Sequence, residues 1–158
     1  MATRHWLIKS EPSVYSIEDL ARDGKTEWSG VRNYKARNYM RDEMRPGDGL
    51  LFYHSNTDPL GVYGIAEVAS PAHPDSTQFK KGDHYYDPES DRDDPRWWCV
   101  DVRHVETFPS PVTRDAMKDK PGLAGMSVLK RGMRLSVMRV TPEEFELVRA
   151  MGRGRRGG

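Results

Sequence analysis

Cysteine and long apolar runs are scarce in this chain. The single cysteine, Cys99, excludes an internal disulfide, and its position in an expected strand favours a buried and inert thiol. No apolar run approaches the roughly 20 residues that cross a bilayer, and the first residues lack the apolar stretch of a signal peptide. We therefore expect no membrane partner and a location in the cytoplasm or nucleus, or in the cytoplasm if the source is bacterial.

An excess of charge of one sign is also missing. The chain has 25 Lys and Arg against 24 Asp and Glu, which gives a formal net charge of +1. Any basic surface that binds nucleic acid must therefore be local and balanced by acid elsewhere. The histidines show no metal-ligand spacing, so we expect no metal and no cofactor. They are His5, His54, His73, His84 and His104.

The length of 158 residues matches one compact domain. We expect a single domain over residues 1–151 that is a monomer. Residues 152–158 contain only Gly and Arg and are expected to form a basic, disordered tail.

The pattern of apolar residues and helix caps predicts an α+β fold in which a strongly bent antiparallel sheet carries helices at its rim, in the form of a small barrel. Ser16, Asn33 and Thr141 are predicted N-caps. In the second helix we expect Tyr34 to face the core. Strands are expected at residues 5–9, 50–54, 61–69, 98–106 and 134–140, and helices at 16–24, 33–44, from 113, at 126–129 and from 141. Residues 70–96 form a long connection, which we interpret as a lid or rim.

One short stretch, residues 27–39, combines an aromatic ring, a tight turn, an amide and cations. Trp28 offers a flat face on which a base can stack, and Asn33 offers a donor and an acceptor for a base edge. Three cations can neutralise phosphate: Arg32, Lys35 and Arg37. The alternative is a polar helix start surrounded by ordinary solvated charges.

Four motifs occur in the order found in a known family, at residues 6–12, 28–33, 46–55 and 64–68. Together they resemble the EVE domain, over nearly the whole chain up to the basic tail. This resemblance implies a PUA-like β-barrel and a module that reads modified bases in DNA or RNA without catalysis. The partner that it implies is nucleic acid carrying a modified base, with modified cytosine in DNA as the first choice and RNA close behind.

The resemblance also implies which stretches border the ligand pocket. Carried over by position, the ligand-binding residues are Lys9, Ser10, Glu11, Pro12, Trp28, Val31, Arg32, Asn33, Tyr34, Tyr53, His54, Ser55 and Asn56. Lys35 and Arg37 are expected to contact the nucleic-acid backbone.

Two alternatives remain open. The first is an RNA-cleaving enzyme of a related barrel type, in which side chains such as Ser10 and His54 would act as nucleophile and base. The chain has no G-x-S-x-G elbow, P-loop, dinucleotide fingerprint or H-E-x-x-H motif, so we predict that it is not an enzyme. The second is a protein-interaction module that uses residues 70–96.

Overall fold

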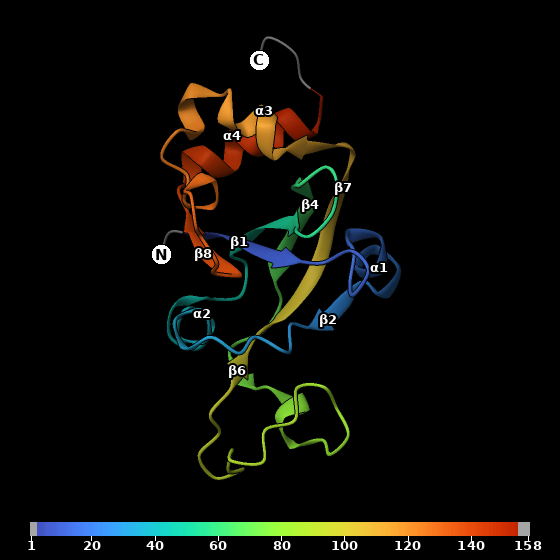
Figure 1. The fold of residues 1–158 in the computed structure, drawn as a ribbon, viewed down its shortest axis with the longest axis vertical. Coiled ribbons are helices and arrows are strands. Elements are labelled where there is room, and N and C mark those ends of the chain that lie inside the picture. Colours follow the sequence, from blue (N-terminus) through green and yellow to red (C-terminus); the bar gives the residue numbers. More distant parts are fainter. Residues whose placement is uncertain (1–2, 155–158) are drawn as a thin grey trace.

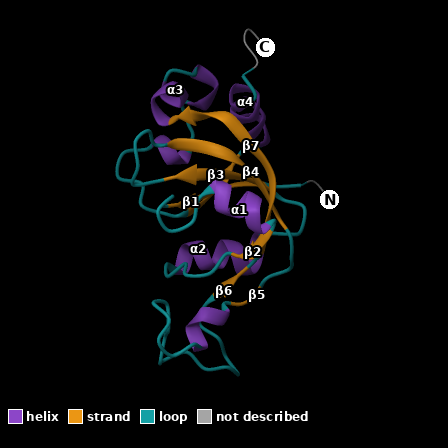
Figure 2. Cartoon of the chain, turned by 90° about the vertical axis from the view of Figure 1, so that its right-hand side faces the viewer, coloured by secondary structure: helices purple, strands orange, loops and turns teal. Residues whose placement is uncertain are grey.

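A curled sheet of six strands forms a half-barrel, and helices cover its ends (Figures 1 and 2). The computed structural model describes residues 3–154. The strand order is β2-β7-β4-β3-β1-β8. The strands are β1 (His5–Ser10), β2 (Lys25–Glu27), β3 (Gly49–His54), β4 (Gly61–Val68), β7 (Asp101–Thr113) and β8 (Val137–Val140). The predicted α+β class and bent sheet with rim helices are confirmed, although the sheet is mixed because β1 and β3 run parallel.

A separate two-stranded ribbon carries the long connection. It pairs β5 (His73–Pro74) with β6 (Trp98–Cys99), and the chain between them lies at the foot of the molecule (Figure 1). A 3-10 turn, Ser76–Phe79, is the regular element within that connection.

The helices begin where the capping residues predict. They are α1 (Ile17–Asp23), α2 (Tyr34–Asn38) with a π-helical continuation (Tyr39–Glu43), α3 (Arg114–Lys118) and α4 (Pro142–Gly152), besides 3-10 turns at Pro121–Leu123 and Ser127–Leu129. Ser16 and Thr141 each form a reciprocal capping box with the residue three positions later. Asn33 caps α2 through its side-chain oxygen. These three predictions are confirmed, because each depends on a local hydrogen bond that satisfies free N–H groups.

Two apolar clusters fill the two faces of the sheet. Alternation along β1 sends Trp6 and Ile8 into one cluster and Leu7 into the other. The first cluster contains α1 and the second is closed by α4. In the described part of the chain, no helix is both long and apolar enough to span a membrane.

Three sequence-based expectations are corrected. The last strand begins at Val137, later than predicted, and β7 continues to Thr113, well beyond residue 106. Tyr34 is 52% exposed and does not face the core. It is the first residue of α2, where its ring stacks on Trp97 and so lies outside the apolar stripe of the helix.

The expected tail is described only in part. Gly152 is the last residue of α4, and Arg153 forms an ion pair with Glu106. Residues 155–158 lie outside the described residues.

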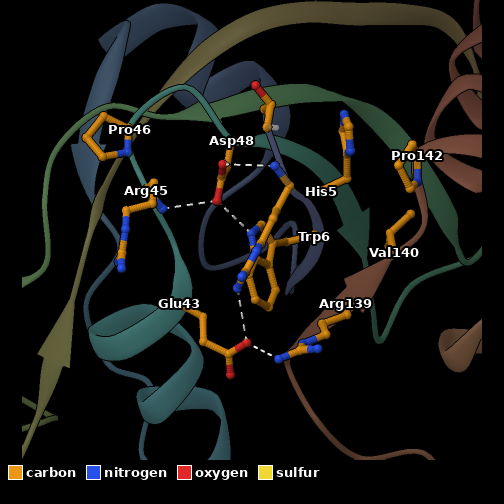
Figure 3. Close-up of a pocket in the computed structure, with 11 residues that line it drawn as sticks. His5, Trp6, Glu43, Arg45, Pro46, Asp48, Arg139, Val140 and Pro142 are labelled. Atoms are coloured by element: carbon orange, nitrogen blue, oxygen red, sulfur yellow. Dashed lines mark hydrogen bonds and ion pairs between the residues drawn. The ribbon is translucent and has the colours of Figure 1, made fainter. Parts of the chain in front are cut away.

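A buried carboxylate joins the beginnings of β1 and β3 (Figure 3). Asp48 accepts hydrogen bonds from the backbone N–H of Arg4 and of Arg45, and from the indole Nε1 of Trp6 at 3.0 Å. Trp6 has no exposed surface, so this carboxylate satisfies an indole N–H that water cannot reach.

We expect Asp48→Ala to lower the free energy of unfolding by about 3 kcal/mol or more, because it removes a charged acceptor and leaves donors without a partner. Chemical denaturation of wild type and variant measures this difference. Asp119→Ala, at an exposed aspartate, is the control and should change stability by less than about 0.5 kcal/mol. A similar small loss in both variants would contradict the assignment.

Candidate nucleic-acid interface

The predicted ligand residues of β1 and β3 lie side by side but on two faces of the sheet. The parallel register pairs Lys9 with Tyr53 and Ser10 with His54. Because neighbouring residues of a strand point to opposite faces, Lys9 and Tyr53 share the α4 side, and Ser10 and His54 share the α1 side. The Lys9 Nζ lies 5.8 Å from the Tyr53 ring centre. Burial, and then the nearby charge of Arg114, lower the pKa of Lys9.

His54 is committed to a structural hydrogen bond. Its Nε2 accepts the backbone N–H of Ile17 at 3.1 Å, at the start of α1, and its ring stacks on Tyr63 at 4.0 Å. The acceptor role requires a neutral ring. Burial lowers the pKa of His54, which keeps the ring neutral near pH 7.

The turn after β1 is also held by internal bonds. The Ser10 hydroxyl donates to the Tyr15 carbonyl at 2.6 Å, and the Ser10 carbonyl accepts from the backbone N–H of Ser55 at 3.0 Å. Glu11 is exposed and Pro12 is half-buried in this turn. Asn56 has a positive φ of 52°, a left-handed conformation that asparagine tolerates.

Trp28 is part of the core near its edge. It is 8% exposed and meets Phe52 and Tyr15 edge to face, at ring distances of 5.4 and 6.2 Å. Among the described residues, no acceptor bonds its indole N–H, and that atom is not fully buried. Val31 is likewise buried at 8% exposure. The rings of Tyr15 and Phe52 therefore cover Trp28, and its indole N–H has no hydrogen-bond partner within residues 3–154.

Arg32 holds the long connection against residues 28–32. Its guanidinium donates to the Asp75 carboxylate at 3.1 Å, to the Thr77 hydroxyl at 3.2 Å and to the Tyr85 carbonyl at 2.7 Å. The same group lies over the rings of Tyr85 and Trp97, at 5.4 and 5.1 Å. These contacts occupy most of its donors.

Asp75 is the partner of Arg32 and is 1% exposed. It also accepts the backbone N–H of Gly30 at 2.8 Å, and both the backbone N–H and the hydroxyl of Thr77. Burial alone would raise its pKa, but the hydrogen bonds from Thr77, Gly30 and Arg32 outweigh burial and hold the pKa below its usual value.

Tyr34 and Trp97 form an aromatic stack at the surface. Their rings are 5.0 Å apart and inclined by 11°, and the Arg37 guanidinium lies 4.7 Å from the Tyr34 ring centre. Arg37 also donates to the Arg96 carbonyl. Lys35 is exposed next to this stack.

A pocket of about 400 Å³, which we call the Tyr85 pocket, opens beside this stack. It is lined by Gly30, Arg32, His84, Tyr85, Tyr86, Asp87 and Trp97. Gly30 has a φ of 88°, and a side-chain carbon there would lie 2.5 Å from the Tyr85 ring. The glycine therefore allows both the turn and the close approach of the ring.

A larger cavity of about 780 Å³ lies elsewhere, at the beginning of β1 and the end of β8. Figure 3 shows Glu43 paired with Arg139, and the same carboxylate forms an ion pair with Arg4. It contains none of the predicted ligand residues. We therefore do not assign the interface to it.

The structure brings residues 28–34 together with the long connection. Sequence reasoning treated that connection as a rim and named none of its tyrosines as ligand residues. The available signal was an aromatic run, His84-Tyr85-Tyr86, within an otherwise polar loop.

Comparisons with known proteins agree with the fold. The EVE domain family profile matches residues 4–151. Human thymocyte nuclear protein 1 is 40% identical over 162 residues, which cover 91% of this chain and 72% of the human protein. A hypothetical protein from Leishmania major has a TM-score of 0.92 and 39% identity, with 98% of each chain covered. The human THYN1 protein in complex with 5-methylcytosine-containing DNA has a TM-score of 0.86 and 38% identity, covering 95% of this chain and 98% of that chain.

Gly30→Ala should displace the Tyr85 ring in addition to straining the backbone. Gly47 has a similar φ of 94° but open space around it, so Gly47→Ala supplies a matched control for the strain alone. We expect Gly47→Ala to cost about 1–2 kcal/mol and Gly30→Ala to cost at least about 1 kcal/mol more, measured by chemical denaturation. Equal losses would show that the ring moves aside freely.

The neutral state of His54 predicts a dependence of stability on pH. Its folded pKa lies below the ordinary value of 6.5, so the unfolded chain binds the proton more readily. The stabilisation is complete above about pH 6.5 and is lost as the pH falls below that value toward the folded pKa. In urea unfolding between about pH 7.5 and 5.5, His54→Gln should flatten this loss. The control His104→Gln, at a histidine bonded to Thr107, should keep the wild-type slope.

Proposed function

The chain belongs to the EVE domain family, and from this premise we propose that it binds nucleic acid and reads a modified base without chemical turnover. The observation that carries the proposal is the complex of human THYN1 protein with DNA containing 5-methylcytosine, which aligns with 95% of this chain. Modified cytosine in DNA is therefore the first ligand to test, and modified RNA is the second. A single domain, a monomer and a cytoplasmic or nuclear location belong to the same proposal.

We propose that the base enters the Tyr85 pocket. A volume of about 400 Å³ lies within the usual range of about 300–1,000 Å³ for small-ligand sites. Tyr85 supplies a partly exposed ring, and Arg32 supplies a planar cation fixed by Asp75. Bases stack well on both kinds of surface.

Three predicted ligand residues outside the lining of the Tyr85 pocket keep hydrogen-bonding capacity. Asn33 uses its side-chain oxygen for the α2 cap, which leaves its amide N–H groups. No hydrogen bond from the Trp28 indole N–H or the Ser55 hydroxyl is found within residues 3–154. Donors of this kind can read the acceptor groups of a base.

The backbone of the nucleic acid would follow α2. Lys35 is exposed and has no ion-pair partner within residues 3–154, so it is the best phosphate contact. Arg37 contributes less, because its guanidinium already donates to the Arg96 carbonyl and to Asn38. Tyr34 would then stack against a neighbouring base.

The internal bonds of Ser10 and His54 support a binding function over RNA cleavage. The Ser10 hydroxyl donates to a backbone carbonyl, and the His54 Nε2 accepts from α1. A nucleophile and its general base must instead bond each other and remain accessible to substrate.

Binding of labelled oligonucleotides by fluorescence anisotropy tests the proposal. At one fixed salt concentration we expect DNA with 5-methylcytosine to bind more tightly than the unmodified sequence. Tyr85→Leu should weaken binding of the modified DNA roughly ten-fold and remove the preference, because base stacking contributes about 1–3 kcal/mol. Lys9→Gln is the control, since Lys9 lies on the opposite face of the sheet, and it should retain the preference.

Equal binding of modified and unmodified DNA and RNA would reject the function. A preference that is lost in Lys9→Gln and kept in Tyr85→Leu would reject only the pocket, and would assign the base to the Lys9–Tyr53 face. Loss of full-length RNA in the presence of chelator would favour the nuclease alternative.

A further inference from the structure

Three strands bring a thiol, an imidazole and a carboxylate together at the base of the long connection. Glu27 belongs to β2, His73 to β5 and Cys99 to β6. Their ligand atoms all lie within 4.8 Å of one another. These residues are far apart in the sequence, which is why the spacing of the histidines gives no sign of the cluster.

We propose that Glu27, His73 and Cys99 form a binding site for a divalent transition metal ion of the Zn²⁺ type. Thiolate, imidazole and carboxylate are the three side-chain ligands that zinc accepts in proteins. The proposal is independent of nucleic-acid binding.

The backbone fixes all three side chains. His73 and Cys99 are directly paired across the β5–β6 ribbon, and Glu27 is directly paired with Asp101 across β2 and β7. Side chains of directly opposed residues project to the same face. Cys99 is the last residue of β6 and Asp101 the first residue of β7, so one short step of chain brings the two pairs together.

The proposed ligands His73 and Glu27 are themselves held by hydrogen bonds, as the ligands of metal sites usually are. The His73 Nε2 lies 2.9 Å from the Asp101 carboxylate, and its Nδ1 lies 3.0 Å from the Pro74 carbonyl, so a metal ion at Nδ1 would replace the proton that Nδ1 donates to Pro74 while Asp101 keeps hold of Nε2. That Nδ1 lies 3.7 Å from the Glu27 carboxylate. Ser76 donates to the other oxygen of Glu27 at 2.6 Å and so orients this carboxylate.

The spacing fits a tetrahedral ion after small movements. With metal bonds of about 2.0–2.3 Å, the ligand atoms of a tetrahedral site stand about 3.3–3.8 Å apart. The separation of 3.7 Å between the His73 Nδ1 and the Glu27 carboxylate already matches, and the other separations, which do not exceed 4.8 Å, must close by at most roughly 1 Å. Water or the Pro74 carbonyl, 3.0 Å from Nδ1, can complete the coordination.

The electrostatic environment favours a cation. The carboxylates of Glu27, Asp75 and Asp101 act on the Cys99 thiol, so the negative charge around the cluster attracts a cation. A divalent cation that binds there displaces the thiol proton and forms the thiolate bond. The proton leaves to solvent and no change of redox state is involved.

Titration of the intact chain with Co²⁺, under reducing conditions, tests the site. Co²⁺ replaces Zn²⁺ and gives a thiolate-to-metal charge-transfer absorption only when cysteine is a ligand. We expect a saturable band at one ion per chain, displaced by Zn²⁺. Cys99→Ser should abolish the band, and Glu27→Gln or His73→Gln should weaken Co²⁺ binding at least ten-fold. His104→Gln, outside the cluster, should leave the titration unchanged.

Circular dichroism and thermal unfolding check that each variant folds. Zn²⁺ should raise the unfolding temperature of wild type and not that of Cys99→Ser. The absence of a saturable band in folded, reduced wild type would overturn the proposal. A band that persists in Cys99→Ser, or that disappears in His104→Gln, would also overturn it, because the metal would then bind elsewhere.

Discussion

The buried carboxylate of Asp75 is the contact on which the candidate interface depends. Placing a charge out of water costs several kcal/mol unless partners replace the lost hydration. Gly30, Thr77 and Arg32 provide those partners, and Gly30 lies 45 positions away in the sequence. Removal of this one group would leave the Gly30 N–H without an acceptor, and Arg32 would be bonded to the long connection only through Thr77 and Tyr85.

A second buried polar side chain extends this constraint through the long connection. Gln78 has no exposed surface, donates to the carbonyls of Asp75 and Trp97, and accepts from Ser90 and the backbone of Trp97. A long connection with little regular structure loses much conformational entropy on ordering. In this connection, hydrogen bonds from the buried side chains of Asp75 and Gln78 take the place of the backbone hydrogen bonds of a helix or sheet. The connection therefore forms a rigid side of the Tyr85 pocket.

The sequence predicts those features of the fold that depend on neighbouring residues. The capping boxes of Ser16 and Thr141 and the cap at Asn33 each span three positions, and all three are present. The exposure of Tyr34 was not predictable, because it depends on a stack with Trp97, more than sixty residues away.

The candidate site follows the same rule: features set by neighbouring residues could be predicted from the sequence, and features set by distant residues could not. The composition of residues 28–34 predicts a binding site there, and Gly30 and Arg32 of this stretch line the Tyr85 pocket. Strand alternation predicts that Lys9 and Ser10 point to opposite faces of the sheet. Which residues of β3 lie beside them could not be predicted, because the parallel pairing of β1 with β3 joins residues that are far apart in the sequence. The role of Arg32 could not be deduced, since an arginine in a basic run gives no sign that a buried aspartate binds it.

Rigidity is what gives such a site its selectivity. Extraction of a base from its stack costs a few kcal/mol, and one methyl group changes binding by only about 1–3 kcal/mol. If the loop that forms the pocket had to become ordered on binding, the free-energy cost of ordering would be as large as the effect of one methyl group. A loop that is already ordered avoids this cost. In the proposed site, Asp75 bonds the backbone of Gly30, and Gln78 bonds the carbonyls of Asp75 and Trp97, so the segment that carries Tyr85 is ordered before a base binds and a small difference in shape can become a difference in affinity.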